Sequence, residues 1–269
     1  MEYLSPVLRF CLYGATVLIA GSIALRLTLS VPAESAFSRR LTGQVSLGLA
    51  LMFVAAVGSV ALFLLMISGG DVAMAFSAEF MGIAAQTPVG QVAAMRVLAG
   101  VALLILLALG WHRLALVPAL LMLLSFGMEG HSLSFGPRLL SSSLVVVHVA
   151  IAAWWLSVIF PLLTVSATER DRFGEVFGRQ AILAVPLLIV AGGALFGVFT
   201  GWQLDLSQDY QRRMAFKLVA VAGILSIAAA NKLYFTGRPG FVWSLRVEAL
   251  VAVALLMLTA FLTATGPKM

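Results

Sequence analysis

Residues 44–68 read QVSLGLALMFVAAVGSVALFLLMIS, an apolar segment without a charged side chain. A transmembrane helix needs about 20 mainly apolar residues, so this stretch predicts a helix that crosses a lipid bilayer. The whole chain shares its character: 62% of the 269 residues are hydrophobic and 10% are charged, with a mean hydropathy of +1.07. Soluble domains contain roughly 45–50% apolar residues. The composition therefore indicates a polytopic membrane protein without a separate soluble domain.

The same length criterion predicts an all-α bundle of eight transmembrane helices in a single domain, residues 1–269. Turn and charge signals separate the apolar segments, among them Gly69-Gly70 and the sequence GRPG at 237–240. The predicted spans are 8–30, 44–68, 92–110, 114–132, 141–167, 180–203, 214–232 and 245–265.

Lysine and arginine predict the orientation, because connections rich in these residues stay on the cytoplasmic side. They concentrate after the first, third, fifth and seventh spans. The residues concerned are Arg39, Arg40, Arg113, Arg170, Arg172, Arg179, Lys232 and Arg238. Both termini are therefore predicted to lie outside. The isoelectric point of about 10.1 would suggest nucleic acid for a soluble protein, but here the basic residues lie mostly in connections, so no nucleic-acid partner is expected.

Two of the three histidines are predicted to lie near the outer face. His131 ends the fourth predicted span and His148 lies in the fifth, whereas His112 lies in a tight inner connection. An ionisable residue within a membrane is costly without a partner and indicates a functional site. His131 and His148 are therefore the first candidates for binding chemistry.

Soft donors surround this histidine pair. Met128 is three residues before His131 and shares its face if the segment is helical, while Glu129 and Cys11 are further candidate ligands at the outer side. Imidazole and thioether together suit copper, particularly Cu(I), and not magnesium or calcium. Other methionines also map to the outer half or outer connections, namely Met66, Met74, Met81, Met95 and Met214. This distribution indicates either a metal-entry surface or ordinary apolar packing.

Ionisable and amide side chains also gather at the inner ends of three predicted spans. Because unpaired charges in lipid are expensive, these groups are predicted to form a structural charge network that ties the helix ends together. Its members are Arg26, Asn231, Lys232, Arg246 and Glu248. Separately, Gly193, Gly197 and Gly201 recur every four residues, which predicts close approach of a neighbouring helix.

Several motifs together resemble the bacterial copper resistance protein D family. In chain order they are Thr87-Pro-Val-Gly90 followed by Arg96, Gly130-His131, His148 before Trp155, Gly192-Gly193, Thr200-Gly201, Lys217, Asn231, Arg246 with Glu248, and Pro267. Two departures occur: Ser157 and Val158 replace two glycines that usually follow the tryptophan, and Val145 replaces an acidic residue before the second histidine.

The resemblance implies an inner-membrane protein of eight spans that handles copper beside a periplasmic copper-binding protein of the copper resistance C type. It also implies that His131 and His148 are the residues relevant to copper. On this interpretation, copper from the periplasm reaches an outer His/Met site for import or for handover to another protein.

Two other classes of function remain open at this point. One is a b-type redox protein with a single haem held by His131 and His148; three histidines exclude two bis-histidine haems. The other is a structural or assembly protein whose histidines bond only to backbone groups. No nucleophile-plus-base arrangement or phosphate-binding loop is present, so we expect no enzyme activity beyond the redox alternative.

Overall fold

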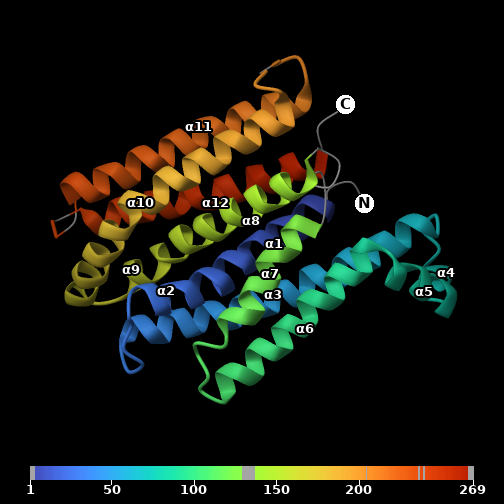
Figure 1. The fold of residues 1–269 in the computed structure, drawn as a ribbon, viewed down its shortest axis with the longest axis horizontal. Coiled ribbons are helices and arrows are strands. Elements are labelled where there is room, and N and C mark those ends of the chain that lie inside the picture. Colours follow the sequence, from blue (N-terminus) through green and yellow to red (C-terminus); the bar gives the residue numbers. More distant parts are fainter. Residues whose placement is uncertain (1–3, 129–136, 204, 236, 239, 266–269) are drawn as a thin grey trace.

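A computed structural model describes residues 4–128, 137–203, 205–235, 237–238 and 240–265. These residues form helices joined by turns and short connections, with no strand among them (Figure 1). The elements are α1 Leu4–Thr16, η1 Val17–Gly21, α2 Ser22–Thr28, α3 Ala36–Ile67, α4 Val72–Ala75, α5 Ala78–Gln86, α6 Pro88–Ala108, α7 Leu116–Leu124, η2 Ser125–Met128, α8 Arg138–Ser157, α9 Ile159–Thr164, α10 Ala167–Thr200, α11 Asp209–Ala230, η4 Asn231–Phe235 and α12 Phe241–Thr265.

Seven helical segments are long and apolar enough to cross a membrane. They correspond to seven of the eight predicted spans, so the all-α membrane fold is confirmed. The segment predicted as the fourth span is shorter within the described residues, with 9 residues of α-helix in α7 and 4 of 3-10 helix in η2. At 1.5 Å per residue this segment reaches about 20 Å, short of the roughly 30 Å hydrocarbon core. An eighth crossing therefore stays a prediction.

Two helices begin well before the apolar segments that predicted them. α3 begins at Ala36 and not at residue 44, and α10 begins at Ala167 and not at residue 180. Serine side chains cap both starts: Ser35 accepts from a backbone N–H at 3.0 Å, and Ser166 does so at 3.3 Å. Such caps satisfy the free N–H groups of a helix start. Helix formation therefore continues into the polar segment, where hydropathy gives no signal.

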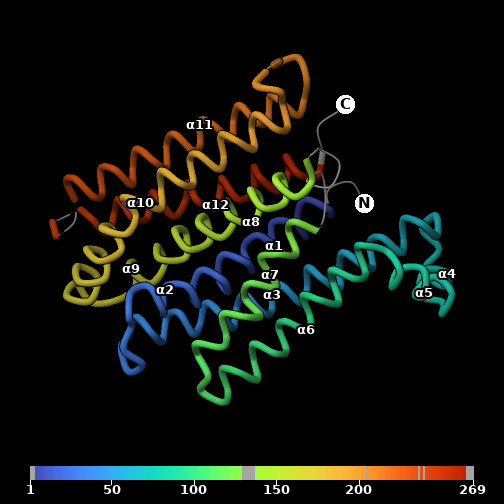
Figure 2. The backbone as a smooth tube through the Cα atoms, viewed as in Figure 1, coloured from blue at the N-terminus to red at the C-terminus, as the bar shows by residue number. Residues whose placement is uncertain are grey.

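The first span lies at the centre of the bundle and is shared by two hydrophobic cores. One core joins α1 and η1 to α3, α6 and α7. The other joins α2 and α3 to α8, α9, α10, α11 and α12. Figure 2 shows the first span between the group that contains α6 and α7 and the group that contains α10, α11 and α12.

Close packing of the first span on α8 depends on Gly21. A Cβ at Gly21 would lie 2.2 Å from the carbonyl oxygen of Ala153 and 2.4 Å from Oγ of Ser157. Only glycine allows the two backbones to approach this closely. Gly21 ends η1, a single π-helical turn within the first span.

The fifth predicted span is broken between α8 and α9, and Pro161 explains the break. Proline has no N–H to bond to the carbonyl four residues earlier, which here belongs to Ser157. Nε2 of Gln44 donates to that carbonyl at 3.1 Å, and Oε1 of Gln44 accepts from Oγ of Ser22 at 2.9 Å. Gln44 is buried. Its amide therefore supplies the hydrogen bond that the proline removes.

The two ends of the bundle differ in the elements they contain. α1 begins and α12 finishes at one end, called here the α1 end, and α9 lies at the opposite end, called the α9 end (Figure 1). A hydrogen bond of 2.9 Å from Tyr13 to Thr263 joins α1 to α12 near the α1 end. The start of α1 and the end of α12 thus lie at the same end of the bundle, while the side of the membrane that this end occupies stays a prediction.

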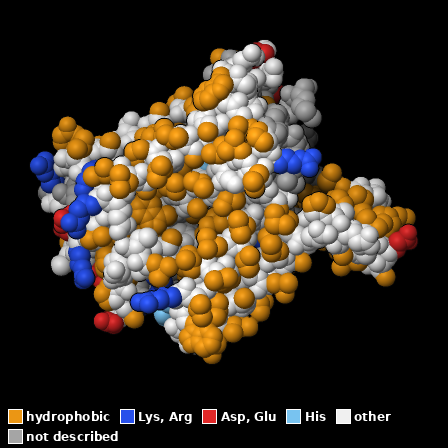
Figure 3. Space-filling model, viewed as in Figure 1, with side chains coloured by type: hydrophobic (Ala, Val, Ile, Leu, Met, Phe, Trp, Pro, Cys, Tyr) orange, Lys and Arg blue, Asp and Glu red, His pale blue; other side chains and the backbone are white. Residues whose placement is uncertain are grey.

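The surface suits a lipid environment. On the face shown in Figure 3, hydrophobic side chains cover the middle of the molecule and most Lys and Arg side chains gather at the α9 end. The connection after α3, predicted as a loop, contains the short helices α4 and α5, which project from the bundle at the α1 end. Asp71 and Ser77 cap these helices by accepting from the backbone N–H groups of Met74 and Phe80.

Candidate metal site

His148 lies within the bundle, ten residues after the start of α8, about 15 Å from the α1 end of that helix. The residue is partly buried and its Nδ1 atom is fully buried. Among the described residues, Nδ1 has no hydrogen-bond partner. A buried polar atom without a partner usually costs about 1–3 kcal/mol. This atom is therefore a candidate donor for a ligand.

The imidazole of His148 faces the backbone of α10 at Gly192. A Cβ at Gly192 would lie 3.0 Å from Cε1 and 3.3 Å from Nδ1 of the imidazole. One turn earlier on α10, the backbone of Leu188 makes a hydrogen bond with the ring, as the structural alternative expects, and Lys217 of α11 lies close enough for its charge to act on it. His148, Gly192 and Lys217 each lie eight to ten residues from the α1 end of their helices. Three helices therefore meet around the histidine at one depth.

Met128 lies at the end of η2, which packs on α8 closer to the α1 end than His148 does. Oγ of Ser142 donates to the carbonyl of Gly127 at 2.9 Å and fixes this contact. The side chain of Met128 is 47% exposed, so its thioether is available to a ligand. His131 and Glu129, the other candidates of this segment, lie outside the described residues.

Cys11, the other soft donor in the prediction, lies on α1 and is a partly buried free thiol. Two residues further on, the ring of Tyr13 stacks on Phe126 of η2 with 5.7 Å between centroids. The structure thus brings the helix that carries Cys11 beside the helix that carries Met128. It records no contact between Cys11 and His148 among the described residues.

Of the five groups predicted to form a charge network, the structure brings two together. Nδ2 of Asn231 donates to Oε2 of Glu248 at 2.6 Å, and both residues are buried. The indole of Trp155 on α8 interacts with the same carboxyl group. Asn231 is the first residue of η4, a π-helical turn. Such turns occur frequently at functional sites.

The other three groups lie elsewhere. Arg26 donates to Oγ of Ser38 at 3.1 Å and to the carbonyl oxygen of Ser38 at 2.9 Å, and so joins α2 to α3. The Nζ atom of Lys232 lies over α10, 3.0 Å from the position that a Cβ of Gly178 would take. Arg246 is exposed. Because it precedes Glu248 by two residues, a helix places the two side chains on different faces.

The N-terminal half of the chain matches a known protein family. The family model described as copper resistance protein D-like, N-terminal domain, matches residues 1–137. The chain belongs to the copper resistance protein D-like family. Together with its long apolar helices, this membership makes it a multi-pass membrane protein related to copper resistance. No curated protein and no solved structure matches the chain.

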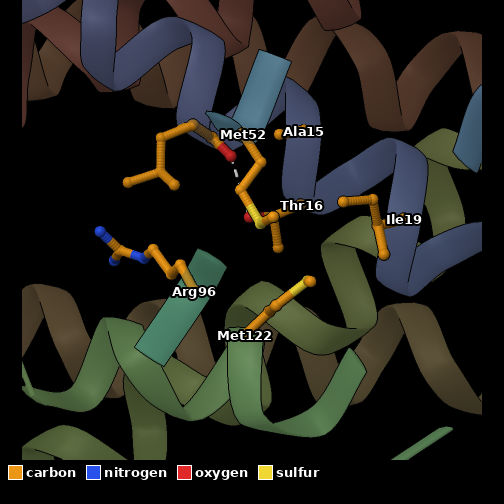
Figure 4. A pocket seen from close by; sticks show the side chains of 7 residues that line it. Ala15, Thr16, Ile19, Met52, Arg96 and Met122 are labelled. Atoms are coloured by element: carbon orange, nitrogen blue, oxygen red, sulfur yellow. Dashed lines mark hydrogen bonds between the residues drawn. The ribbon is translucent and has the colours of Figure 1, made fainter. Parts of the chain in front are cut away.

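The matched domain of this copper resistance protein D-like chain contains a second group of thioethers. Met52 and Met122 line a gap together with Arg96 that has no room for a water molecule, and Figure 4 shows the guanidinium of Arg96 extending away from the two methionines. The Cε atoms of Met52 and Met122 lie 2.6 and 3.9 Å from the position of a Cβ on Gly100. Arg96 is buried, and its Nε donates to Oγ of Ser125 at 2.9 Å. The buried guanidinium makes this space a poor receptor for a copper cation.

Sequence reasoning did not find that Gly192 contacts the histidine. The regular glycine series pointed to Gly193, Gly197 and Gly201 as a packing surface, and this prediction is wrong. A Cβ at Gly193 would meet nothing within 4 Å, while Gly197 faces Trp202 just after its own helix. Gly201 has a φ of 61° and ends α10. The glycine that contacts His148 is Gly192, directly before Gly193. A spacing pattern in the sequence does not show which neighbouring helix each face of α10 contacts.

Proposed function

We propose that this protein binds copper within the membrane through His148 and takes it up at the α1 end. The observation that carries the proposal is the buried Nδ1 of His148, which has no partner among the described residues. Neutral imidazole is a common ligand of copper, and thioether favours Cu(I). His131 and Met128 are proposed as further ligands, with Glu129 and Cys11 as auxiliary donors.

The proposal places the α1 end at the periplasmic side of a bacterial inner membrane. It agrees with the positive-inside rule, because basic residues dominate the connections at the opposite end. Copper would then arrive from the periplasm, where a copper-binding protein of the copper resistance C type is the proposed donor. From His148 the ion would be imported or handed to another membrane protein.

The haem alternative is less well supported by the contacts of His148. The edge of the imidazole that carries Nδ1 and Cε1 faces the backbone of α10 at Gly192. A metal ion requires a small rearrangement there, whereas a porphyrin on this edge requires α10 to move away. This contact favours an ion over a macrocycle, so copper binding is the function we propose.

Metal analysis and an absorption spectrum of the same purified, copper-loaded sample test the proposal. We expect near-stoichiometric copper and no Soret band. His148→Ala should abolish copper binding and His131→Ala should weaken it severely. His112→Ala is the matched control. His112 is exposed in the connection between α6 and α7, which lies away from the α1 end and from His148.

Three results would contradict the proposal. Stoichiometric copper in the variant that lacks both His131 and His148 would place the ligands elsewhere. A Soret band in the wild-type protein would assign the pair to haem. Equal copper loss in His112→Ala would indicate a general effect on the fold and not a site at His148.

A further inference from the structure

Glu248 is the only acidic side chain buried in the core among the described residues. The other buried charged side chain is that of Arg96, and both residues are 4% exposed. Glu248 lies seven residues after the start of α12, about 10 Å from the α9 end of that helix. A carboxyl group at such a place needs a cation or a proton to balance its charge.

The described neighbours of Glu248 supply no cation. Its hydrogen bond comes from the neutral amide of Asn231, and its other polar neighbour is the indole of Trp155. The ammonium group of Lys232 lies over Gly178 of α10, and Arg246 is exposed on another face of α12. A neutral, protonated carboxyl group is therefore the state that these contacts favour.

The remaining elements packed on α12 do not change this conclusion. α9 contains no ionisable residue, and Tyr234, the other ionisable residue of η4 besides Lys232, is exposed. α1 and α11 also pack on α12, and their ionisable groups lie toward the α1 end of the bundle. These groups are Arg9, Cys11, Tyr13, Asp209, Tyr210, Arg212, Arg213 and Lys217.

α8 connects this carboxyl group to the candidate metal site. His148 and Trp155 lie on the same helix, seven residues or about 10 Å apart, and Trp155 interacts with Glu248. Arg96 and Lys217 already place basic groups in the half of the bundle that contains His148. A copper ion bound there adds a further positive charge, which a carboxylate next to Trp155, roughly 10–15 Å away, would partly offset.

We propose that Glu248 carries a proton in the copper-free protein and releases it when copper binds at His148. The O–H bond of the carboxyl group breaks, the proton passes to water at the α9 end, and the carboxylate remains hydrogen-bonded to Asn231. With a coupling of about tenfold, at most about half a proton leaves on average for each Cu(I) bound, so the release offsets part of the added charge. This inference rests on the proposed function of His148 and adds a proton to its mechanism.

Physical estimates give the size of the expected coupling. Two unit charges roughly 10–15 Å apart at an effective dielectric constant near 20 alter a binding constant by roughly tenfold. Linkage makes the effect reciprocal: copper favours loss of the proton, and loss of the proton strengthens copper binding by the same factor.

Infrared difference spectroscopy on the full-length protein tests the proposal directly. Copper-loaded minus copper-free spectra of the wild-type protein should show a decrease in one protonated carboxyl band. Glu248→Gln should lack this band, because glutamine keeps an acceptor for Asn231 but has no acidic proton. Glu175→Gln, at an exposed position on α10, is the matched control and should retain the band.

A titration with Cu(I) in weakly buffered solution gives the second readout. Glu248→Gln should release up to about half a proton fewer per copper than the wild-type protein and bind copper about three- to tenfold more weakly. Glu175→Gln should behave like the wild-type protein in both respects. The infrared comparison needs only wild-type protein for its first step, so it holds even if Glu248→Gln folds poorly.

The outcomes separate this inference from the proposed function. Stoichiometric copper with no change in any carboxyl band overturns the proton-release inference and leaves copper binding at His148 in place. A carboxyl band that copper removes equally in Glu248→Gln assigns the proton to another residue and also overturns the inference. Wild-type protein that binds no copper overturns the proposed function, and the coupled proton release is then overturned with it.

Discussion

The backbone of Gly192 lies against the imidazole of His148: a Cβ at Gly192 would be 3.0 Å from Cε1 and 3.3 Å from Nδ1. These separations are shorter than those of ordinary side-chain contacts. Glycine at this position therefore sets how close α10 comes to the histidine. The relationship offers a way to disturb the candidate site without removing its ligand.

Gly192→Ala should weaken copper binding about tenfold or more, because the added methyl group pushes the imidazole away from its present position. A tenfold loss corresponds to about 1.4 kcal/mol. Gly193→Ala is the matched control, since a Cβ there would meet nothing within 4 Å. Copper titrations of the two variants measure the difference. Equal affinities in both variants would show that the contact with α10 does not position the ligand.

Gly21→Ala should destabilise the bundle more than any effect on copper binding would explain. The new Cβ would lie 2.2 Å from the carbonyl of Ala153, so α8 and the first span must separate. Overpacking of this kind typically costs about 1–3 kcal/mol. Thermal unfolding in detergent measures the loss. Gly14→Ala, in α1 with nothing within 4 Å of its Cβ, should unfold like the wild-type protein, and an equal loss in both would assign the cost to glycine replacement in general.

The sequence predicted most of the fold because the bilayer imposes a strong length and composition rule. Seven of the eight predicted spans are long apolar helices. The rule failed where structure does not depend on hydropathy: the polar start of α10 is fixed by the Ser166 cap, and the break after α8 follows from Pro161. These features depend on single hydrogen bonds, which an average over 20 residues does not detect.

The site was predicted only in part because a sequence shows which residues are ionisable but not what they face. His148 was chosen for its place in an apolar segment, and the structure finds its Nδ1 buried and without a described partner. The contact with Gly192 depends on how α8 and α10 are rotated. For the same reason, Asn231 and Glu248 meet, while Arg246, although close in sequence to Glu248, turns to another face.

Gln44→Leu should lower stability by about 1 kcal/mol. The substitution removes the donor to the carbonyl of Ser157 and the acceptor for Ser22, and a hydrogen bond between membrane helices contributes roughly 0.6–1.7 kcal/mol. Gln91→Leu is the control, because Gln91 is exposed on α6. The midpoint of chemical unfolding in detergent compares the two. A midpoint for Gln44→Leu at or above that of the wild-type protein would show that the carbonyl freed by Pro161 needs no protein partner.

Glu248→Ala and Arg246→Ala, two residues apart on α12, should differ in their consequences for folding. Loss of the Glu248 carboxyl group leaves the amide of Asn231 without its acceptor at 2.6 Å, and an unsatisfied buried donor costs about 1–3 kcal/mol. We therefore expect a clearly reduced yield of folded protein for Glu248→Ala. Arg246 is exposed, so Arg246→Ala should give a yield close to that of the wild-type protein. Size-exclusion chromatography of both detergent-solubilised variants measures these yields.

Similar losses in the two variants would mean that Arg246 and Glu248 stabilise each other, as the predicted charge network required. Normal yield of Glu248→Ala with reduced copper binding would instead assign this carboxyl group a part in copper handling and none in folding.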